Sequence, residues 1–152
     1  MPVDDPCLIE LERTLHREMP ITVPMGIRAV AWQDRRLSMQ MPLEPNRNHQ
    51  YSAFAGSLNA LCTIVGWGTV FLLLHELGRK GNIVIRRGHI RYLRPVRDEV
   101  IVAQGLPLDP TGESFFFELL ESKGRSKIDV SAQIADAEGT LASFTGSYVV
   151  QD

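Results

Sequence analysis

One stretch of the sequence carries no charge: residues 60–74 read ALCTIVGWGTVFLLL. At about fifteen residues it is shorter than the roughly twenty that an α-helix needs to cross a bilayer. Polar and charged residues lie on both sides of it, with Asn59 before and His75-Glu76 after. We therefore expect a helix over 56–78 that is buried on nearly every side inside a soluble fold. Gly78 is a typical residue to end it.

Composition excludes several classes of protein. The chain has 152 residues, which predicts a single domain over 1–152 with a substantial core. Hydrophobic residues make up 44% and charged residues 22%, as in ordinary globular proteins. The net charge of −2 argues against a nucleic-acid partner.

The cysteines indicate whether disulfides or a metal site are expected, and the first residues indicate whether a secretory signal is present. Two cysteines, Cys7 and Cys62, cannot build a disulfide framework, and no Cys/His spacing predicts a metal site. The beginning of the sequence, MPVDDPC, is acidic and has no apolar segment of a secretory signal. We expect a cytoplasmic protein that does not associate with membranes.

Periodicity predicts the remaining elements. Leu8, Leu11 and Leu15 follow helical spacing in a lead-in over 1–20, whose helix spans 6–18. Alternation of apolar and polar residues predicts half-buried strands. The expected strands are 26–32, 37–43, 82–96 with an irregularity at Gly88, 99–106, 128–134 and 140–150, with a short helix over 110–122. A mainly antiparallel sheet that wraps around the long helix gives a two-layer α+β domain.

Three stretches carry a family resemblance. They are 46–58 (NRNHQYSAFAGSL), 90–96 (IRYLRPV) and 144–149 (FTGSYV). In this order around one buried helix, they resemble the hot-dog fold thioesterases, above all the thioesterase domain at the C-terminus of some acetyltransferase-like bacterial proteins. The resemblance implies a curved sheet wrapped around one long helix, and a homodimer, which could pair into a tetramer. It also implies acyl-thioester sites between subunits, with no metal and no organic cofactor.

The start of the long helix is the expected catalytic centre. Thioester hydrolysis needs hydrogen-bond donors aimed at the carbonyl oxygen, and the unpaired N–H groups at a helix N-terminus provide them. Gly56 allows close approach of the substrate, and Ser57 can supply a second donor. The alternative is that Gly56-Ser57 only begins the helix.

A well-studied branch of the fold uses a loop Asn, then His-Gly-Gly, then an acid two turns into the helix. By spacing, Asn48 matches the Asn and Gly56 the second Gly. Phe54 stands at the position of the His, Ala55 at the first Gly, and Thr63 at the acid. The resemblance therefore leaves the group that attacks the carbonyl unassigned.

Gly56, Asn59 and Thr63 lie on one face of the helix, and Asn59 and Thr63 form a polar pair one turn apart on a helix that is otherwise apolar. We expect them to hold an attacking water with help from Asn48; alternatively, they satisfy each other or the backbone. Glu44 is the carboxylate of the preceding loop, and His49 could act as a general base or line the substrate site.

Five arginines lie close together, at positions 86, 87, 91, 94 and 97. Arg91 and Arg94 could bind the phosphates of coenzyme A, whereas a solvated strand face is the simpler interpretation. Phe54 is a further substrate-binding candidate. The aromatic residues of the helix, Trp67 and Phe71 together with Val70, or those at 115–117, could line an acyl slot.

These observations predict hydrolysis of an acyl-CoA or acyl-carrier thioester. The alternative, motivated by Thr63 at the acid position, is a non-catalytic acyl-ligand-binding module of the same fold. A dehydratase of this fold would present a His-carboxylate pair at the helix, which we do not find in the sequence. Cys62 in an apolar helix is expected to be a buried hydrophobe rather than a nucleophile.

Overall fold

The computed structural model describes residues 5–151. The helices are α1 (Pro6–Glu18), α2 (Thr22–Met25), the 3-10 helix η1 (Glu44–Asn46), α3 (Ala55–Glu76) and α4 (Pro110–Lys123). The strands are β1 (Arg28–Gln33), β2 (Arg36–Pro42), β3 (Asn82–Tyr92), β4 (Val100–Gly105), β5 (Arg125–Asp136) and β6 (Gly139–Gln151).

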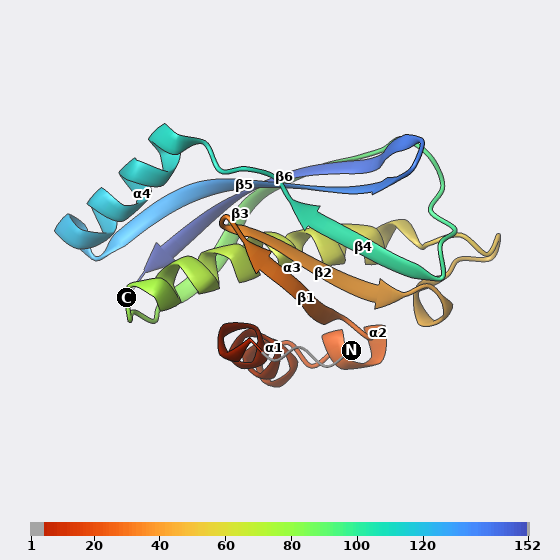
Figure 1. Cartoon of the computed structure of the whole chain (residues 1–152), viewed down its shortest axis with the longest axis horizontal. Helices are drawn as coiled ribbons and strands as arrows, with labels where there is room; N and C mark the ends of the chain where they lie inside the picture. Colours follow the sequence, from red (N-terminus) through yellow and green to blue (C-terminus); the bar gives the residue numbers. More distant parts are fainter. Residues whose placement is uncertain (1–4, 152) are drawn as a thin grey trace.

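The strands form a six-stranded sheet in the order β1-β2-β4-β5-β6-β3, and every neighbouring pair is antiparallel. The curved sheet lies over α3, and α1 lies below β1 and α3 (Figure 1). The inward residues of β5 and β6, such as Ile134 and Phe144, are buried, whereas their neighbours along the strands are more exposed. This period of two places the core between sheet and helix. The α+β architecture expected from the sequence is confirmed.

Helix α3 is buried along most of its surface. Its more accessible positions in the apolar region follow one narrow line, which we call the open stripe: Gly56, Ala60, Thr63, Trp67 and Phe71. At 100° per residue, these positions fall within roughly 80° of one another around the helix axis. By length and composition α3 could cross a membrane, but 67% of its most apolar window is buried, as in a core helix.

Helix α3 ends two residues earlier than the expected 78. Leu77 is the C-cap, and Gly78 follows with a φ of 65°, a left-handed conformation that glycine adopts without strain. The N–H of Gly78 donates to the carbonyl of His75, and that of Arg79 to the carbonyl of Leu74, both at 3.0 Å. These two bonds satisfy carbonyls that the helix end would otherwise leave unpaired.

The structure corrects two other boundaries. The segment between α1 and β1, for which no element is expected from the sequence, contains the one-turn helix α2, and the Thr22 hydroxyl donates to the carbonyl of Met19 at 2.8 Å. Strand β3 ends at Tyr92, and its irregularity falls between Ile85 and Arg87 rather than at Gly88. The chain leaves the sheet after Tyr92 because the next two amides both donate to the carbonyl of Leu141.

Helix α1 is fixed along the outer edge of β1. Its apolar face is buried, and Glu12 accepts hydrogen bonds from the Arg28 side chain at 3.2 Å and from the backbone N–H of Ala29 at 3.3 Å. The Nε2 atom of His16 lies 2.8 Å from the carbonyl oxygen of Ile27. Helix α1 thus covers the edge of the sheet at β1. Residues 1–4 of the predicted lead-in lie outside the described part of the chain.

Candidate functional site

Among residues 5–151, the first turn of α3 presents two backbone donors without a partner, the N–H groups of Ala55 and Gly56. Phe54 is the N-cap residue, and its side chain makes no capping hydrogen bond. The amides of Ser57 and Leu58 both donate to the carbonyl of Phe54, at 3.0 and 3.2 Å. Within residues 5–151 the N–H of Gly56 has no acceptor, and Gly56 is exposed. The helix dipole makes this position favourable for a negative oxygen.

The aromatic ring of Phe54 folds back over Gly56. A Cβ atom placed on Gly56 would lie 2.5 Å from Cε2 of Phe54, so a side chain here requires the ring to move. Phe54 is 56% exposed, which leaves it free to do so. Glycine therefore allows both the ring and an incoming ligand to approach the helix backbone closely. The structure brings these two predicted residues together.

The side chain of Asn48 stabilises the loop before α3 through three hydrogen bonds. Its Oδ1 accepts from the backbone N–H of Gln50 at 2.8 Å and of Ser52 at 3.2 Å, while its Nδ2 donates to the hydroxyl of Ser52 at 3.0 Å. Both ends of the Asn48 side chain are thus engaged inside the loop. Tyr51, at the tip, has a φ of 61° and lies under the guanidinium of Arg47.

Asn46 anchors the base of the same loop. Its side chain is 2% exposed and donates to the carbonyls of Met25 and Pro42, at 2.8 and 2.7 Å. Its own carbonyl accepts from the N–H of Phe54 at 2.7 Å. These bonds fix where α3 begins relative to β2 and α2, a role that sequence reasoning did not assign to Asn46. A polar residue inside a polar loop gives no periodic signal of burial.

Two tyrosines hold α3 against the sheet. The hydroxyl of Tyr92 on β3 donates to the carbonyl of Ala55 at 3.0 Å, and that of Tyr148 on β6 donates to the carbonyl of Thr63 at 2.7 Å. Burial raises the pKa of both phenols, with a smaller contribution from nearby Cys62, so both remain protonated donors. The apolar–polar alternation along β3 and β6 indicates in the sequence that both tyrosines point toward the helix. It does not indicate which backbone carbonyls accept their hydrogen bonds.

The expected water-holding pair lies on the accessible side of α3. Asn59 is exposed and Thr63 is half-buried, and in the described part of the chain neither side chain makes a hydrogen bond. Both groups are therefore available to a water or a ligand.

The other predicted reactive groups are not poised for catalysis in this way. Glu44 forms an ion pair with Arg47 at 3.2 Å, and His49 is exposed. The Cys62 thiol is fully buried, which raises its pKa to about 12 and makes it a poor nucleophile.

The two arginines predicted to bind phosphates differ in their surroundings. Arg94 forms ion pairs with Asp136 at 3.1 Å and Glu138 at 3.2 Å, in the turn between β5 and β6. Arg91 is exposed, and no acidic partner is found for it among residues 5–151. The same part of the chain holds no group of three or more His, Cys, Asp or Glu side chains that could bind a metal.

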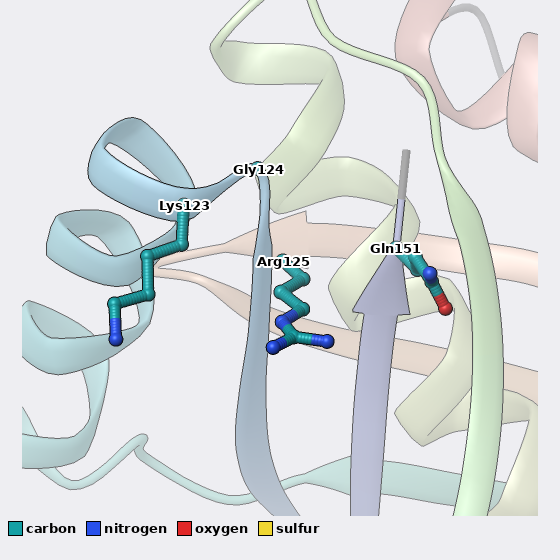
Figure 2. Close-up of a pocket in the computed structure, with 4 residues that line it drawn as sticks. All are labelled: Lys123, Gly124, Arg125 and Gln151. Carbon is teal, nitrogen blue, oxygen red and sulfur yellow. The ribbon is translucent and has the colours of Figure 1, made fainter.

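The hollows of the surface lie elsewhere. Figure 2 shows one at the corner between α4, β5 and β6, lined by Lys123, Gly124, Arg125 and Gln151. In Figure 1 this corner is at the opposite end of the molecule from the loop before α3. It is a shallow, wide-open depression without a nucleophile or a general base, and we do not assign the reaction to it.

Comparison with known proteins identifies the family. A family model described as "Putative thioesterase (yiiD_Cterm)" matches residues 8–152. A crystal structure from Shewanella oneidensis, described as a "putative thioesterase", is 32% identical with a TM-score of 0.86 and covers 96% of this chain and 98% of that one.

Two further structures have the same fold. A protein of unknown function from Chlorobaculum tepidum is 28% identical with a TM-score of 0.87, covering 95% of this chain and 93% of its own. A thioesterase from Haemophilus influenzae is 18% identical with a TM-score of 0.74, covering 95% and 90%. The fold is therefore the hot-dog fold of thioesterases, and the chain belongs to the thioesterase family yiiD_Cterm.

Proposed function

We propose that the protein hydrolyses the thioester of an acyl-CoA or an acyl-carrier conjugate at the first turn of α3. The observation that carries this proposal is the unpaired, exposed N–H of Gly56 at the positive end of a 22-residue helix. A thioester carbonyl that accepts from this N–H would be polarised where its negative charge grows in the transition state.

The attacking group in this proposal is water. The side chains of Asn59 and Thr63 lie one turn apart beside Gly56 and have no partner in the described structure, so they can orient a water toward the carbonyl carbon. Addition of water forms the C–O bond. Collapse of the intermediate breaks the C–S bond, and the departing thiolate takes up a proton, leaving a carboxylic acid and a free thiol.

Two substitutions at one position test the role of the amide. Gly56→Pro and Gly56→Ala both add a Cβ that meets the ring of Phe54, but only proline removes the N–H. We expect Gly56→Pro to lower kcat about a hundredfold relative to Gly56→Ala, the usual loss of one oxyanion donor. The assay is release of free thiol from a panel of acyl-CoAs, with thermal melting to confirm that both variants fold. Equal activity of the two variants would refute the role of the Gly56 amide.

We also propose a homodimer in which β3 of two copies pairs edge to edge. Strand β3 has a neighbour on one side only within the described sheet, and the other terminal strand, β1, is covered by α1. The unpaired backbone groups of β3 can accept a second strand. Light scattering after size-exclusion chromatography should give twice the mass of one chain; a monomer at assay concentration would contradict the proposal.

A second candidate function is binding of an acyl thioester without turnover. One reason is that Thr63, which cannot ionise, stands where one branch of the hot-dog fold uses an acid. A second reason is that the side chain of Asn48 is engaged in hydrogen bonds within its own loop. This second function predicts that acyl-CoA raises the melting temperature while no thiol is released. Release of thiol by the purified protein, lost in Gly56→Pro, would exclude it.

A further inference from the structure

A groove runs along the C-terminal half of α3, away from the first turn. It lies between α1, α3 and the segment 78–83 that leads into β3, and its volume is about 860 Å³. This is within the size range of small-molecule sites. It is more enclosed than the hollow in Figure 2.

The floor of the groove is apolar and the rim is charged. Trp67, Phe71 and Leu74 form the floor, and the rings of Trp67 and Phe71 stack with their centres 5.4 Å apart. Both carboxylates and cations line the groove beside this floor, contributed by Glu10, Arg17, Glu18, Arg79 and Lys80. An apolar ligand can bury its surface on this floor without leaving a polar group unpaired.

The open stripe of α3 runs along one face of the helix from the candidate active site toward the groove. Gly56 begins the stripe, while Trp67 and Phe71, which end it, belong to the groove. The rise along the helix axis from Gly56 to Trp67 is roughly 16 Å. An extended chain advances about 1.2 Å per bond, so spanning this distance takes about 13 bonds.

We infer that the groove binds the distal part of a long, unbranched acyl chain whose thioester lies at Gly56, so that Trp67 and Phe71 set the preferred chain length. The inference rests on the proposed function and narrows its substrate to long-chain acyl thioesters. A short acyl group would end beside Ala60 or Thr63 and gain none of the apolar contacts of the floor. Each buried methylene is worth about a fourfold gain in binding.

A chain-length series tests the inference on the full-length protein. For wild type we expect kcat/KM to rise from butyryl-CoA to tetradecanoyl-CoA. Phe71→Ala should lower the ratio of the tetradecanoyl to the butyryl value by about tenfold or more, because the Phe71 ring stacks on Trp67, where the tetradecanoyl chain ends, and a butyryl chain does not reach either ring. Phe71→Trp, which fills the groove, should move the optimum toward shorter chains. Ile9→Ala is the control, because Ile9 is an exposed apolar residue of α1 that does not line the groove, and it should leave the ratio within about twofold.

Fluorescence provides a readout that does not depend on turnover. The protein has two tryptophans, Trp32 and Trp67, and of these only Trp67 lines the groove. Titration with tetradecanoate should change the emission of wild type and of Trp32→Phe, and the change should be lost in Trp67→Phe. Titration with butyrate should produce no such change.

The outcomes separate the two proposals. A Trp67-dependent signal without thiol release from any acyl-CoA would refute hydrolysis while supporting the groove as an acyl site. Hydrolysis with the same chain-length ratio in wild type and both Phe71 variants, and without a Trp67-dependent signal, would overturn the inference. If Phe71→Ala changes the mass in solution but not the ratio, the groove is covered by a second copy and the inference is also overturned.

Discussion

The hydroxyl of Tyr148 donates to the backbone carbonyl of Thr63 at 2.7 Å, joining the middle of the buried helix to strand β6. The neighbouring turn of the helix is adapted to this contact. A Cβ atom on Gly66 would lie 2.0 Å from the tyrosine hydroxyl and 2.3 Å from its Cζ, so only glycine leaves room for the ring. The position of Thr63, and with it that of the open stripe, therefore depends on Tyr148.

Substitutions at both residues of this contact should lower stability. Tyr148→Phe removes one hydrogen bond and should lower the free energy of unfolding by about 1 kcal/mol. Gly66→Ala inserts a methyl group into a filled space and should cost about 1–3 kcal/mol from overpacking, partly offset by the roughly 1 kcal/mol better helix propensity of alanine. Urea denaturation at constant slope measures both. A more stable Gly66→Ala variant would show that Tyr148 can move aside at little cost.

Asn48 should act on the reaction through its loop. Asn48→Asp keeps the oxygen that accepts from Gln50 and Ser52, whereas Asn48→Ala removes all three bonds. We expect the aspartate variant to retain most of the wild-type kcat/KM and the alanine variant to lose about tenfold, with faster proteolysis within the loop. Equal losses in both variants, with the loop equally resistant to protease, would indicate direct contact of the Asn48 amide with the substrate.

The turn between β5 and β6 should lose stability in acid. The backbone N–H of Glu138 and the side chain of Arg94 both donate to Asp136, and these bonds lower its pKa below the ordinary 3.8. Because the folded state holds the charged form more tightly than the unfolded state, this contribution is present above pH 3.8 and is lost as the pH falls through the lower, folded value. Asp136→Asn should therefore melt below wild type at neutral pH, and the difference should shrink in strong acid. A constant difference at all pH values would assign the effect to the turn geometry alone.

The two cysteines should differ in reactivity. Burial raises the pKa of the Cys62 thiol to about 12, so almost none of it is thiolate at mildly alkaline pH. Burial and the nearby Asp5 carboxylate also raise the pKa of Cys7, but Cys7 is only half-buried. A thiol reagent should modify Cys7 in the native protein and both cysteines in urea. Cys62→Ala should retain thioesterase turnover; its complete loss in a variant that still folds would point to a nucleophilic cysteine.

Much of the fold followed from periodicity, and the exceptions have local causes. The alternating residues of β2, β5 and β6 predicted strands close to those observed, because each has one buried face. The end of β3 was placed too far along the chain, since the apolar residues Leu93 and Val96 still occur after the backbone has turned to bond with Leu141. Helix α2 is a single turn, too short to show a period.

The candidate site was predicted less completely than the fold. Gly56 and Phe54 could be placed together because they are close in sequence and lie at a helix start. The engagement of Asn48 within its loop, and of Arg94 with Asp136, depends on where the chain folds back on itself, and residue type alone does not specify this. The roles of Tyr92 and Tyr148 likewise depend on which strands lie beside α3.

The contact of α1 with β1 limits how copies of this chain can assemble. A sheet with two bare edges could add copies at both ends and grow into a filament. Here Glu12 already accepts the N–H of Ala29 on one terminal strand, which leaves β3 as the edge used in the proposed homodimer. When two such strands meet, the combined sheet ends at an α1 on either side. In the proposed homodimer, α1 would therefore cover both outer edges of the combined sheet, and we expect its removal to produce an open-ended, aggregation-prone array.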